Sequence, residues 1–383
     1  MSRRDGVLLA MRLTLRAVLR DTGVLLLLVV AGVAYAFFYP LPYAHEEVTR
    51  VPVAIVDGDP GPLTRQLVRF AMASPKLDVR LVTGDEHEAR EALWRREVEG
   101  LLVVPRGLHA DVYRGRAVTL PVMGNGAYLL LNKTVLQGFA EVVGTLSAGI
   151  EITRRQAGGA TPAMAALQRA PVRVAAHSLF NTRDGYASYI VPAVSVLIVQ
   201  QTVVISAAML VGTWAERGRS RLRWLARPRN GLGLLATLSA FGTLTGLFWF
   251  GFVFWFWDLP RGGNPWGAAA LLPVFCLASA AMGVALGVWA GRRERVFMLW
   301  VPTSLPLMFL SGVPWPVASI PAPLNVLAAL FPSSPGILAF VRLNQQGASL
   351  ADVAPLGLQL FVLSGVYLVL AGTVAARRGR LPP

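Results

Sequence analysis

Residues 186–230 read YASYIVPAVSVLIVQQTVVISAAMLVGTWAERGRSRLRWLARPRN. The first part, 186–213, has no charged side chain and is long enough to cross the hydrocarbon core of a bilayer, which is about 30 Å thick. The second part, 214–230, holds six arginines and a single acidic residue. An uncharged run followed at once by a strongly basic segment is typical of a helix that crosses a membrane and ends in the cytoplasm.

The same pattern recurs along the chain. Five further apolar runs are long enough to span: 23–42, 232–257, 267–291, 296–313 and 355–375. The short segments on one side of these runs (1–22, 214–230, 292–295 and 376–383) together hold 17 Lys and Arg against 4 Asp and Glu. Cytoplasmic loops carry an excess of Arg and Lys, so we expect an α-helical polytopic membrane protein with six transmembrane helices and both termini in the cytoplasm.

The overall composition agrees with this fold class. The chain is 54% hydrophobic and 15% charged, whereas soluble domains average about 25% charged residues. Its net charge of +15 flanks apolar runs and forms no basic stripe with interleaved aromatics, so we predict a lipid bilayer environment and no nucleic-acid partner. The single cysteine, Cys276, excludes an intramolecular disulfide, and with four histidines the sequence predicts no Cys/His metal cluster.

The N-terminal segment, 1–22, has arginines at four-residue spacing. Arg12, Arg16 and Arg20 alternate with leucines on other faces, which predicts an amphipathic helix on the inner leaflet. The other interpretation is a basic flank of the next span, and both can hold. The run 23–42 is interpreted as an uncleaved first transmembrane helix, because it is not followed by a small-x-small cleavage site.

A polar block, 43–185, separates the first span from the other five. It is nearly neutral, with 17 Lys and Arg against 15 Asp and Glu, and we place it outside the cell as a large external (periplasmic) domain. Short apolar runs alternate with helical patterns, which indicates an α/β fold. The predicted elements are strands at 53–56, 77–82, 100–104 and 118–122, and helices at 62–73, 85–96 (with Asp85 as N-cap) and 128–156. Residues 157–185 are predicted to return irregularly to the membrane.

The segment 314–345, between the fifth and sixth spans, is apolar but interrupted by prolines. Proline removes a helical hydrogen bond, so the segment does not suit a continuous spanning helix. We predict short re-entrant or interfacial helices packed against protein, where irregular backbone can be satisfied.

Motifs for catalysis are missing from the sequence. The nearest match to an ATP-binding P-loop is Asn132-Lys133-Thr134, but Ala127 and Asn132 stand where the motif needs glycine. Hydrolase motifs such as GxSxG and HExxH do not occur. The chain is therefore predicted to be no enzyme and to bind no cofactor itself.

Three segments resemble the ABC-2-type permeases of ABC transporters, most of all the bacterial efflux and drug-export branch, which is type V exporter-like. The first is VAIVDGDPGPLTRQLVRF at 53–70, which is similar to the strand, turn and helix that open the external domain in that family. The second is TWAERGRS at 213–220. The third is the Ser311-Gly312 pair with the prolines that follow it.

The resemblance at 213–220 implies a docking site. In the family, a run similar to R-E-x-E-R-G-T precedes a short cytoplasmic helix that docks into the ATPase subunit. This chain keeps Glu216-Arg217-Gly218 and departs at Arg219-Ser220. The implied coupling residues are Glu216, Arg217, Gly218, Arg219, Arg221 and Arg223. The other interpretation is an ordinary basic cytoplasmic loop.

The resemblance near the fifth span implies a re-entrant segment. Its candidate residues are Ser311, Gly312, Pro314, Pro316, Pro332 and Pro335. The other interpretation is a proline-rich outer loop.

Polar residues also lie in the middle of the second span. Gln200, Gln201 and Thr202 are costly in a membrane unless they face protein or water. They indicate either a substrate path or hydrogen bonds to a neighbouring helix, and glutamine between helices favours the second.

The resemblance implies a permease subunit of an ATP-driven exporter in the bacterial inner membrane. ATP and Mg would be bound by a separate ABC ATP-binding subunit. The permease would pair as a homodimer or with a paralogue, and a periplasmic adaptor is a further expected partner. The alternative from another class is a sensor or scaffold whose external domain binds a ligand or an envelope partner without transport. Drugs, lipids and polymers all stay open as substrates.

Overall fold

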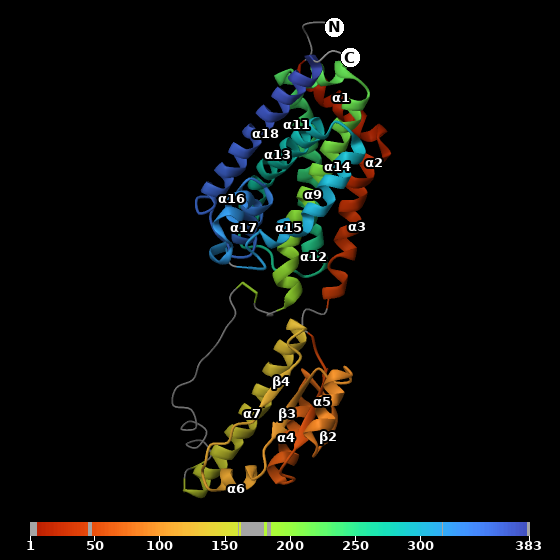
Figure 1. The fold of residues 1–383 in the computed structure, drawn as a ribbon. Helices are drawn as coiled ribbons and strands as arrows, with labels where there is room; N and C mark the ends of the chain where they lie inside the picture. Colours follow the sequence, from red (N-terminus) through yellow and green to blue (C-terminus); the bar gives the residue numbers. More distant parts are fainter. Residues whose placement is uncertain are drawn as a thin grey trace. The chain divides into compact units, whose positions relative to one another are not determined.

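The chain folds into two compact units. The computed structural model describes residues 6–44, 48–159, 161, 180–181, 185–315 and 317–380. One unit is discontinuous in sequence and comprises Met1–Glu46 with Ser178–Pro383, and the other is the contiguous insertion Glu47–His177. Figure 1 draws the first unit as a bundle of helices and the second as a sheet covered by helices.

The helical unit begins with α1 (Val7–Arg20). Next come α2 (Thr22–Leu25) and α3 (Ala31–Phe38), and a π-helical segment at Leu26–Val30 joins α2 to α3. A second π-helical segment, Phe248–Val253, joins α11 to α12. The remaining helices of this unit are α9 (Tyr186–Glu216), α10 (Arg219–Leu225), α11 (Pro228–Leu247), α12 (Phe254–Phe256), α13 (Pro265–Ala290), α14 (Arg293–Trp300), α15 (Ser304–Phe309), α16 (Ala322–Ala329), α17 (Ser333–Asn344) and α18 (Ala354–Arg380).

Six helices in the described part of the chain are long and apolar enough to cross a membrane. Five match predicted spans: Thr22–Tyr43, Tyr186–Glu216, Pro228–Phe256, Pro265–Ala290 and Ala354–Gly379. The sixth, Leu130–Ala157, belongs to the other unit. The chain is thus a mostly helical polytopic membrane protein. The six helices differ from the six predicted spans, because Leu130–Ala157 is among them and 296–313 is not.

The predicted fifth span, 296–313, is wrong as a single continuous helix. The chain forms α14, then a 3-10 turn at Val301–Thr303, then the short α15, and turns away after Phe309. Pro302 and Pro306 cause the break, because proline has no backbone N–H to donate to the helix.

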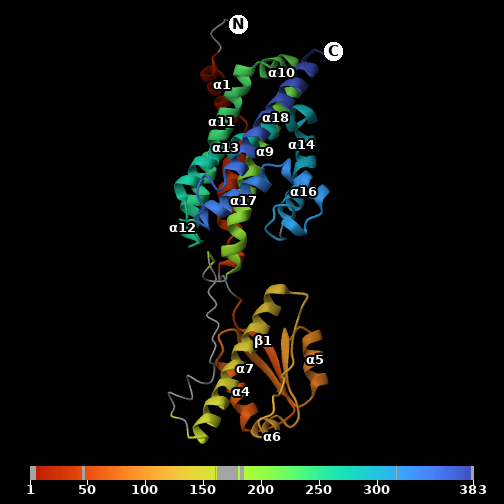
Figure 2. The same ribbon diagram turned by 90° about the vertical axis from the view of Figure 1, so that its left-hand side faces the viewer.

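The helix α9 lies at the centre of its unit, and 94% of its most apolar window is buried. It lies beside α13 (Figure 2). Two glycines of α13, spaced four residues apart, make the closest contact. A Cβ atom at Gly283 would lie 2.5 Å from the carbonyl oxygen of Val204, and one at Gly287 would lie 2.5 Å from that of Ala208. Small residues at this spacing let two helix backbones approach closely, which replaces the hydrophobic driving force that lipid cannot supply.

The insertion is an α/β unit built on a four-stranded sheet. The strands β1 (Val51–Asp57), β2 (Leu77–Thr83), β3 (Gly100–Val104) and β4 (Val122–Gly124) lie in the order β2-β1-β3-β4. β1 pairs in parallel with β2 and β3, and β4 pairs antiparallel with β3. The predicted strand at 118–122 begins only at Val122, because Pro121 cannot donate to the ladder.

Helices cover both faces of this sheet (Figure 2). On one face α4 (Pro62–Ala73), α6 (Leu108–Tyr113) and α7 (Leu129–Ala157) bury Val53 and Ile55 of β1. On the other, α5 (Glu86–Trp94) covers Ala54 and Val56. Parallel strands are usually buried on both faces in this way. The predicted helices at 62–73, 85–96 and 128–156 are present, and Asp85 caps α5 by accepting from the amide of His87 at 2.8 Å. The short helix α6 was not predicted.

The apolar stripe of α7 explains why this helix is apolar enough to count among the helices that could cross a membrane. Val135, Phe139, Val142 and Leu146 are buried in the core of the α/β unit. The helix is therefore packed into the core of the α/β unit. Most of the predicted irregular return, 157–185, lies outside the described residues.

Candidate functional site

The predicted coupling residues lie at the end of the helical unit that holds α1, α10 and the last turns of α18 (Figure 2). Glu216 ends α9, and Arg217 follows it as the C-cap. Gly218 has φ +122° and ψ 163°, a backbone conformation open almost only to glycine, and it reverses the chain into α10. The loop predicted at 214–230 is therefore largely helical, since α9 runs to Glu216, α10 begins at Arg219 and α11 begins at Pro228.

Apolar and aromatic contacts hold α10 in place. Leu222 and Leu225 are buried. The Trp214 and Trp224 rings meet edge to face with centroids 5.7 Å apart, and the Arg221 guanidinium lies 5.7 Å from the Trp214 ring centroid. The contact of Arg221 with Trp214 is a cation–π geometry. Arg223 is exposed and its side chain passes close to Gly379 of α18.

Arg293 links three segments at this end. Its guanidinium forms two hydrogen bonds with the carboxylate of Asp21, at 2.9 and 3.0 Å. Its backbone N–H donates to Oε1 of Glu216 at 2.7 Å. Because Arg293 is the first residue of α14, Glu216 caps that helix and places a negative charge at its N-terminus, where the helix dipole favours it.

Asp21 lies between α1 and the first span and caps α2, since its Oδ1 accepts from the amide of Val24 at 3.2 Å. Burial alone would raise the pKa of this carboxyl. Hydrogen bonds and charge attraction from Arg293, with backbone amides, outweigh burial and lower the pKa of Asp21 below its ordinary value. The Asp21–Arg293 pair is therefore an ionised, charge-assisted bridge at neutral pH.

Neither member of this bridge was singled out from the sequence. Asp21 and Arg293 are 272 residues apart. Each lies in an arginine-rich segment, and such segments are expected on the cytoplasmic side of any membrane protein. The one usable signal was that Asp21 is among four acidic residues in those basic segments.

The polar residues of α9 lie in its most buried part. Thr202 donates to the carbonyl of Val199 within its own helix at 2.9 Å. Both polar atoms of the fully buried Gln200 side chain, and Nε2 of Gln201, have no hydrogen-bond partner among the described residues. The interhelical hydrogen bonds that favoured a packing role are thus not formed by these two amides.

The candidate re-entrant residues surround a sharp bend. The axes of α16 and α17 differ by 83° across a short break, which makes the pair a broken span or a re-entrant loop. Buried Ser311 donates to the carbonyl of Met308 at 2.6 Å, and Gly312 has φ +82°. Buried Pro332 precedes the first residue of α17, and its carbonyl accepts from Gly336 at 2.9 Å. Pro335 is buried in the first turn of α17, Pro314 is half-buried in the turn before α16, and Pro316 lies outside the described residues.

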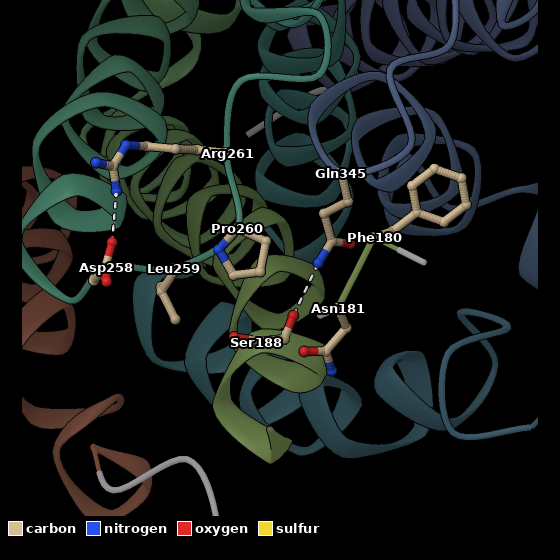
Figure 3. A pocket seen from close by; sticks show the side chains of 8 residues that line it. All are labelled: Phe180, Asn181, Ser188, Asp258, Leu259, Pro260, Arg261 and Gln345. Carbon is tan, nitrogen blue, oxygen red and sulfur yellow. Dashed lines mark hydrogen bonds and ion pairs between the residues drawn. The ribbon is translucent and has the colours of Figure 1, made fainter. Parts of the chain in front are cut away.

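A polar pocket of about 410 Å³ is lined by residues at the start of α9, after α12 and after α17 (Figure 3). Gln345 donates to the backbone carbonyl of Ser188 at 2.9 Å, and Arg261 pairs with Asp258 at 3.7 Å. These groups offer hydrogen bonds to a polar ligand. They include no pairing of a nucleophile with a base, and the described residues contain no group of three or more potential metal ligands.

Comparison with known families decides the assignment. Residues 22–373 match the family model described as ABC-2 family transporter protein. The chain belongs to the ABC-2 transporter family. Among curated proteins, none matches the sequence.

Membership in the ABC-2 transporter family makes the chain a membrane permease component of an ABC transporter. Permeases of this kind are transport subunits and associate with an ABC ATP-binding subunit. The ABC-2 match covers the inserted α/β unit and most of the helical unit, and it extends over every predicted site residue.

Proposed function

We propose that this ABC-2 permease is the membrane subunit of an ATP-driven exporter in the bacterial inner membrane, energised by a separate ATP-binding subunit. Both termini and α10 would lie in the cytoplasm. The α/β unit would lie outside, where it could meet a periplasmic adaptor. The asymmetry of charge supports this orientation, because the segments on the proposed cytoplasmic side carry 13 of the 15 net positive charges (17 basic residues less 4 acidic ones).

The contacts of Glu216 and Arg293 carry the proposal. A partner that displaces α10 moves Gly218 and the end of α9, and Glu216 passes that movement to the first amide of α14. Arg293 passes it on to Asp21 at the start of the first span. One docking event on α10 would therefore reach α9, α14 and the first span through hydrogen bonds.

Gln200 and Gln201 are the proposed polar lining of the substrate path. Among the described residues, both polar atoms of the Gln200 amide and Nε2 of Gln201 have no hydrogen-bond partner, and leaving a buried polar group unsatisfied costs about 1–3 kcal/mol. A passing substrate, or a conformational change that opens α9 to water, would satisfy them. The bend between α16 and α17 is proposed to be re-entrant, and two permease chains, identical or paralogous, would enclose the path.

The test is ATPase coupling in the intact transporter. Permease and ATP-binding subunit are co-purified in lipid nanodiscs, and ATP hydrolysis is compared for wild type, Glu216→Ala and Glu294→Gln. Glu294 is an exposed glutamate in the first turn of the same helix and serves as the matched control. We expect Glu216→Ala to keep the complex assembled but to lose most of the stimulation of ATP hydrolysis by the permease.

Wild-type stimulation in Glu216→Ala would contradict the coupling route. A wild-type permease that never changes ATP hydrolysis, and never moves substrate into sealed inverted vesicles, would favour the sensor or scaffold alternative instead.

A further inference from the structure

A second cavity, of about 840 Å³, lies between α1, the start of the first span, the end of α9 and α10. Its lining contains five arginines and one acidic residue: Arg16, Arg20, Arg217, Arg221, Arg293 and Asp21. Counting these charges, five positive and one negative, the lining carries an excess of four positive charges.

Only part of this charge is neutralised within the chain. Asp21 is held by the two terminal nitrogens, Nη1 and Nη2, of the Arg293 guanidinium. Across the ranges that the structure describes, no carboxylate pairs with Arg16, Arg20 or Arg217. Several guanidinium groups converging on one hollow form a site for a group with more than one anionic oxygen, since each guanidinium can hold two oxygens at once.

The surroundings of the cavity match the headgroup layer of a membrane. The helix α1 leaves its leucines uncovered: Leu8, Leu13 and Leu19 are 74%, 42% and 55% exposed, and Leu13 itself lines the cavity. A short helix with uncovered leucines and regular arginines, joined directly to a span, lies in the interface plane. Trp214 and Trp224 also line the cavity, and tryptophan concentrates at this depth.

We propose that this cavity binds the phosphodiester headgroup of an anionic phospholipid of the inner leaflet. Arg16 and Arg20 approach the phosphate from α1, and Arg217 and Arg221 approach it from the region of α10. Basic pockets between helices at a membrane surface bind acidic headgroups in this manner. The proposal requires that the chain lies in a membrane with this end at the headgroup layer. It does not depend on the direction of transport.

The site has a consequence for α10. Arg221 lies in α10, the helix that is proposed to dock the ATP-binding subunit, and Arg217 lies two residues before it. A bound headgroup would tie α10 to α1 and so hold the docking helix in one position before the partner arrives.

The experiment measures lipid binding to the delipidated full-length protein by native mass spectrometry. Phosphatidylglycerol and phosphatidylcholine with identical acyl chains are titrated against wild type, the pair Arg16→Gln with Arg20→Gln, and the control pair Arg12→Gln with Arg229→Gln. The control removes the same charge from exposed arginines of α1 and α11 that do not line the cavity. We expect the cavity pair to bind phosphatidylglycerol about 30-fold more weakly, or about fivefold for each arginine removed. The control pair should stay within about twofold of wild type.

Equal losses in both pairs, or equal affinity of wild type for the two lipids, would overturn the proposal. Millimolar inorganic phosphate and an acidic peptide serve as competitors. If inorganic phosphate displaces the lipid when both are present at equal concentration, the site belongs to soluble phosphate. If only the peptide displaces the lipid, the site belongs to an acidic protein segment. If the cavity pair does not fold, wild type still decides: phosphatidylglycerol binding must weaken as salt is raised and phosphatidylcholine binding must not.

Discussion

The contact between α9 and α13 allows a sharp test of how the helical unit is held together. The perturbation is Gly287→Ala. The new Cβ atom would lie 2.5 Å from the carbonyl oxygen of Ala208, whereas ordinary van der Waals contact begins at 3.4 Å. The two backbones must therefore separate by about 0.9 Å at this point (3.4 − 2.5). Neither atom can rotate away, because one is a backbone oxygen and the other is fixed to the helix.

Separation at Gly287 also loosens the contact at Gly283, which packs on the same face of α9 one turn away. Overpacking of this kind costs about 1–3 kcal/mol. Replacing glycine by alanine also brings a gain of about 1 kcal/mol in helix propensity, so the net loss is up to about 2 kcal/mol. For a unit of this size that net loss corresponds to a fall in the unfolding midpoint of up to roughly 8 °C.

The assay is thermal unfolding of the purified protein in one detergent, followed by intrinsic tryptophan fluorescence. Gly365→Ala in α18 is the matched control, since its Cβ atom would meet no other atom within 4 Å. We expect the midpoint to fall for Gly287→Ala and to stay level or rise for Gly365→Ala. A Gly287→Ala protein as stable as wild type would refute the close-packing argument.

Two further predictions concern the charged bridge and the α/β core. Asp21→Asn and Arg293→Gln should each lower the unfolding free energy by about 1–3 kcal/mol, between the values for exposed and buried pairs, and the double variant should lose less than the sum in a double-mutant cycle. The folded pKa of Asp21 lies below its unfolded value of 3.8, so the bridge contributes fully above that value and is lost as pH falls through the folded pKa. If the wild-type protein and Asp21→Asn are equally stable at pH 7, this prediction is wrong. Phe139→Ala should cost the α/β unit about 3–5 kcal/mol and speed hydrogen exchange in β1 and β3 but not in α13, and uniform exchange rates across both units would count against it.

Local patterns in the sequence predicted those elements whose causes are local. The helix at 62–73 has the bounds of α4, because Pro62 starts it and the turn at 57–60 precedes it. The spans at 186–213 and 267–291 were predicted correctly, because an uncharged apolar run of that length nearly always forms a membrane-spanning helix. The fifth span failed for the converse reason. Its hydropathy was sufficient, but Pro302 and Pro306 interrupt its hydrogen bonds, which hydropathy does not measure.

The site was less accessible to sequence reasoning than the fold. Glu216 and Gly218 were chosen by resemblance, and the structure supplies a physical task for each, a cap for α14 and a positive φ. Asp21 and Arg293 could not be paired in advance, since their contact depends on the packing of α9, α14 and the first span. The roles of Gln200 and of the bent segment remain predictions.

The bridge between Asp21 and Arg293 also bears on how the protein is made. A ribosome adds roughly 5–20 residues per second, so the 272 residues that separate the two partners take roughly 14–54 s to synthesise. During that time the first span is already in the membrane, held there by its own mean hydropathy of 2.3 and with little protein around it. The α/β unit can fold in the same interval, because it is one contiguous and compact stretch of the chain, Glu47–His177. The first part of the chain to enter the bilayer therefore gains its bridge to α14 only after the α/β unit and the helices α9 to α13 have been made.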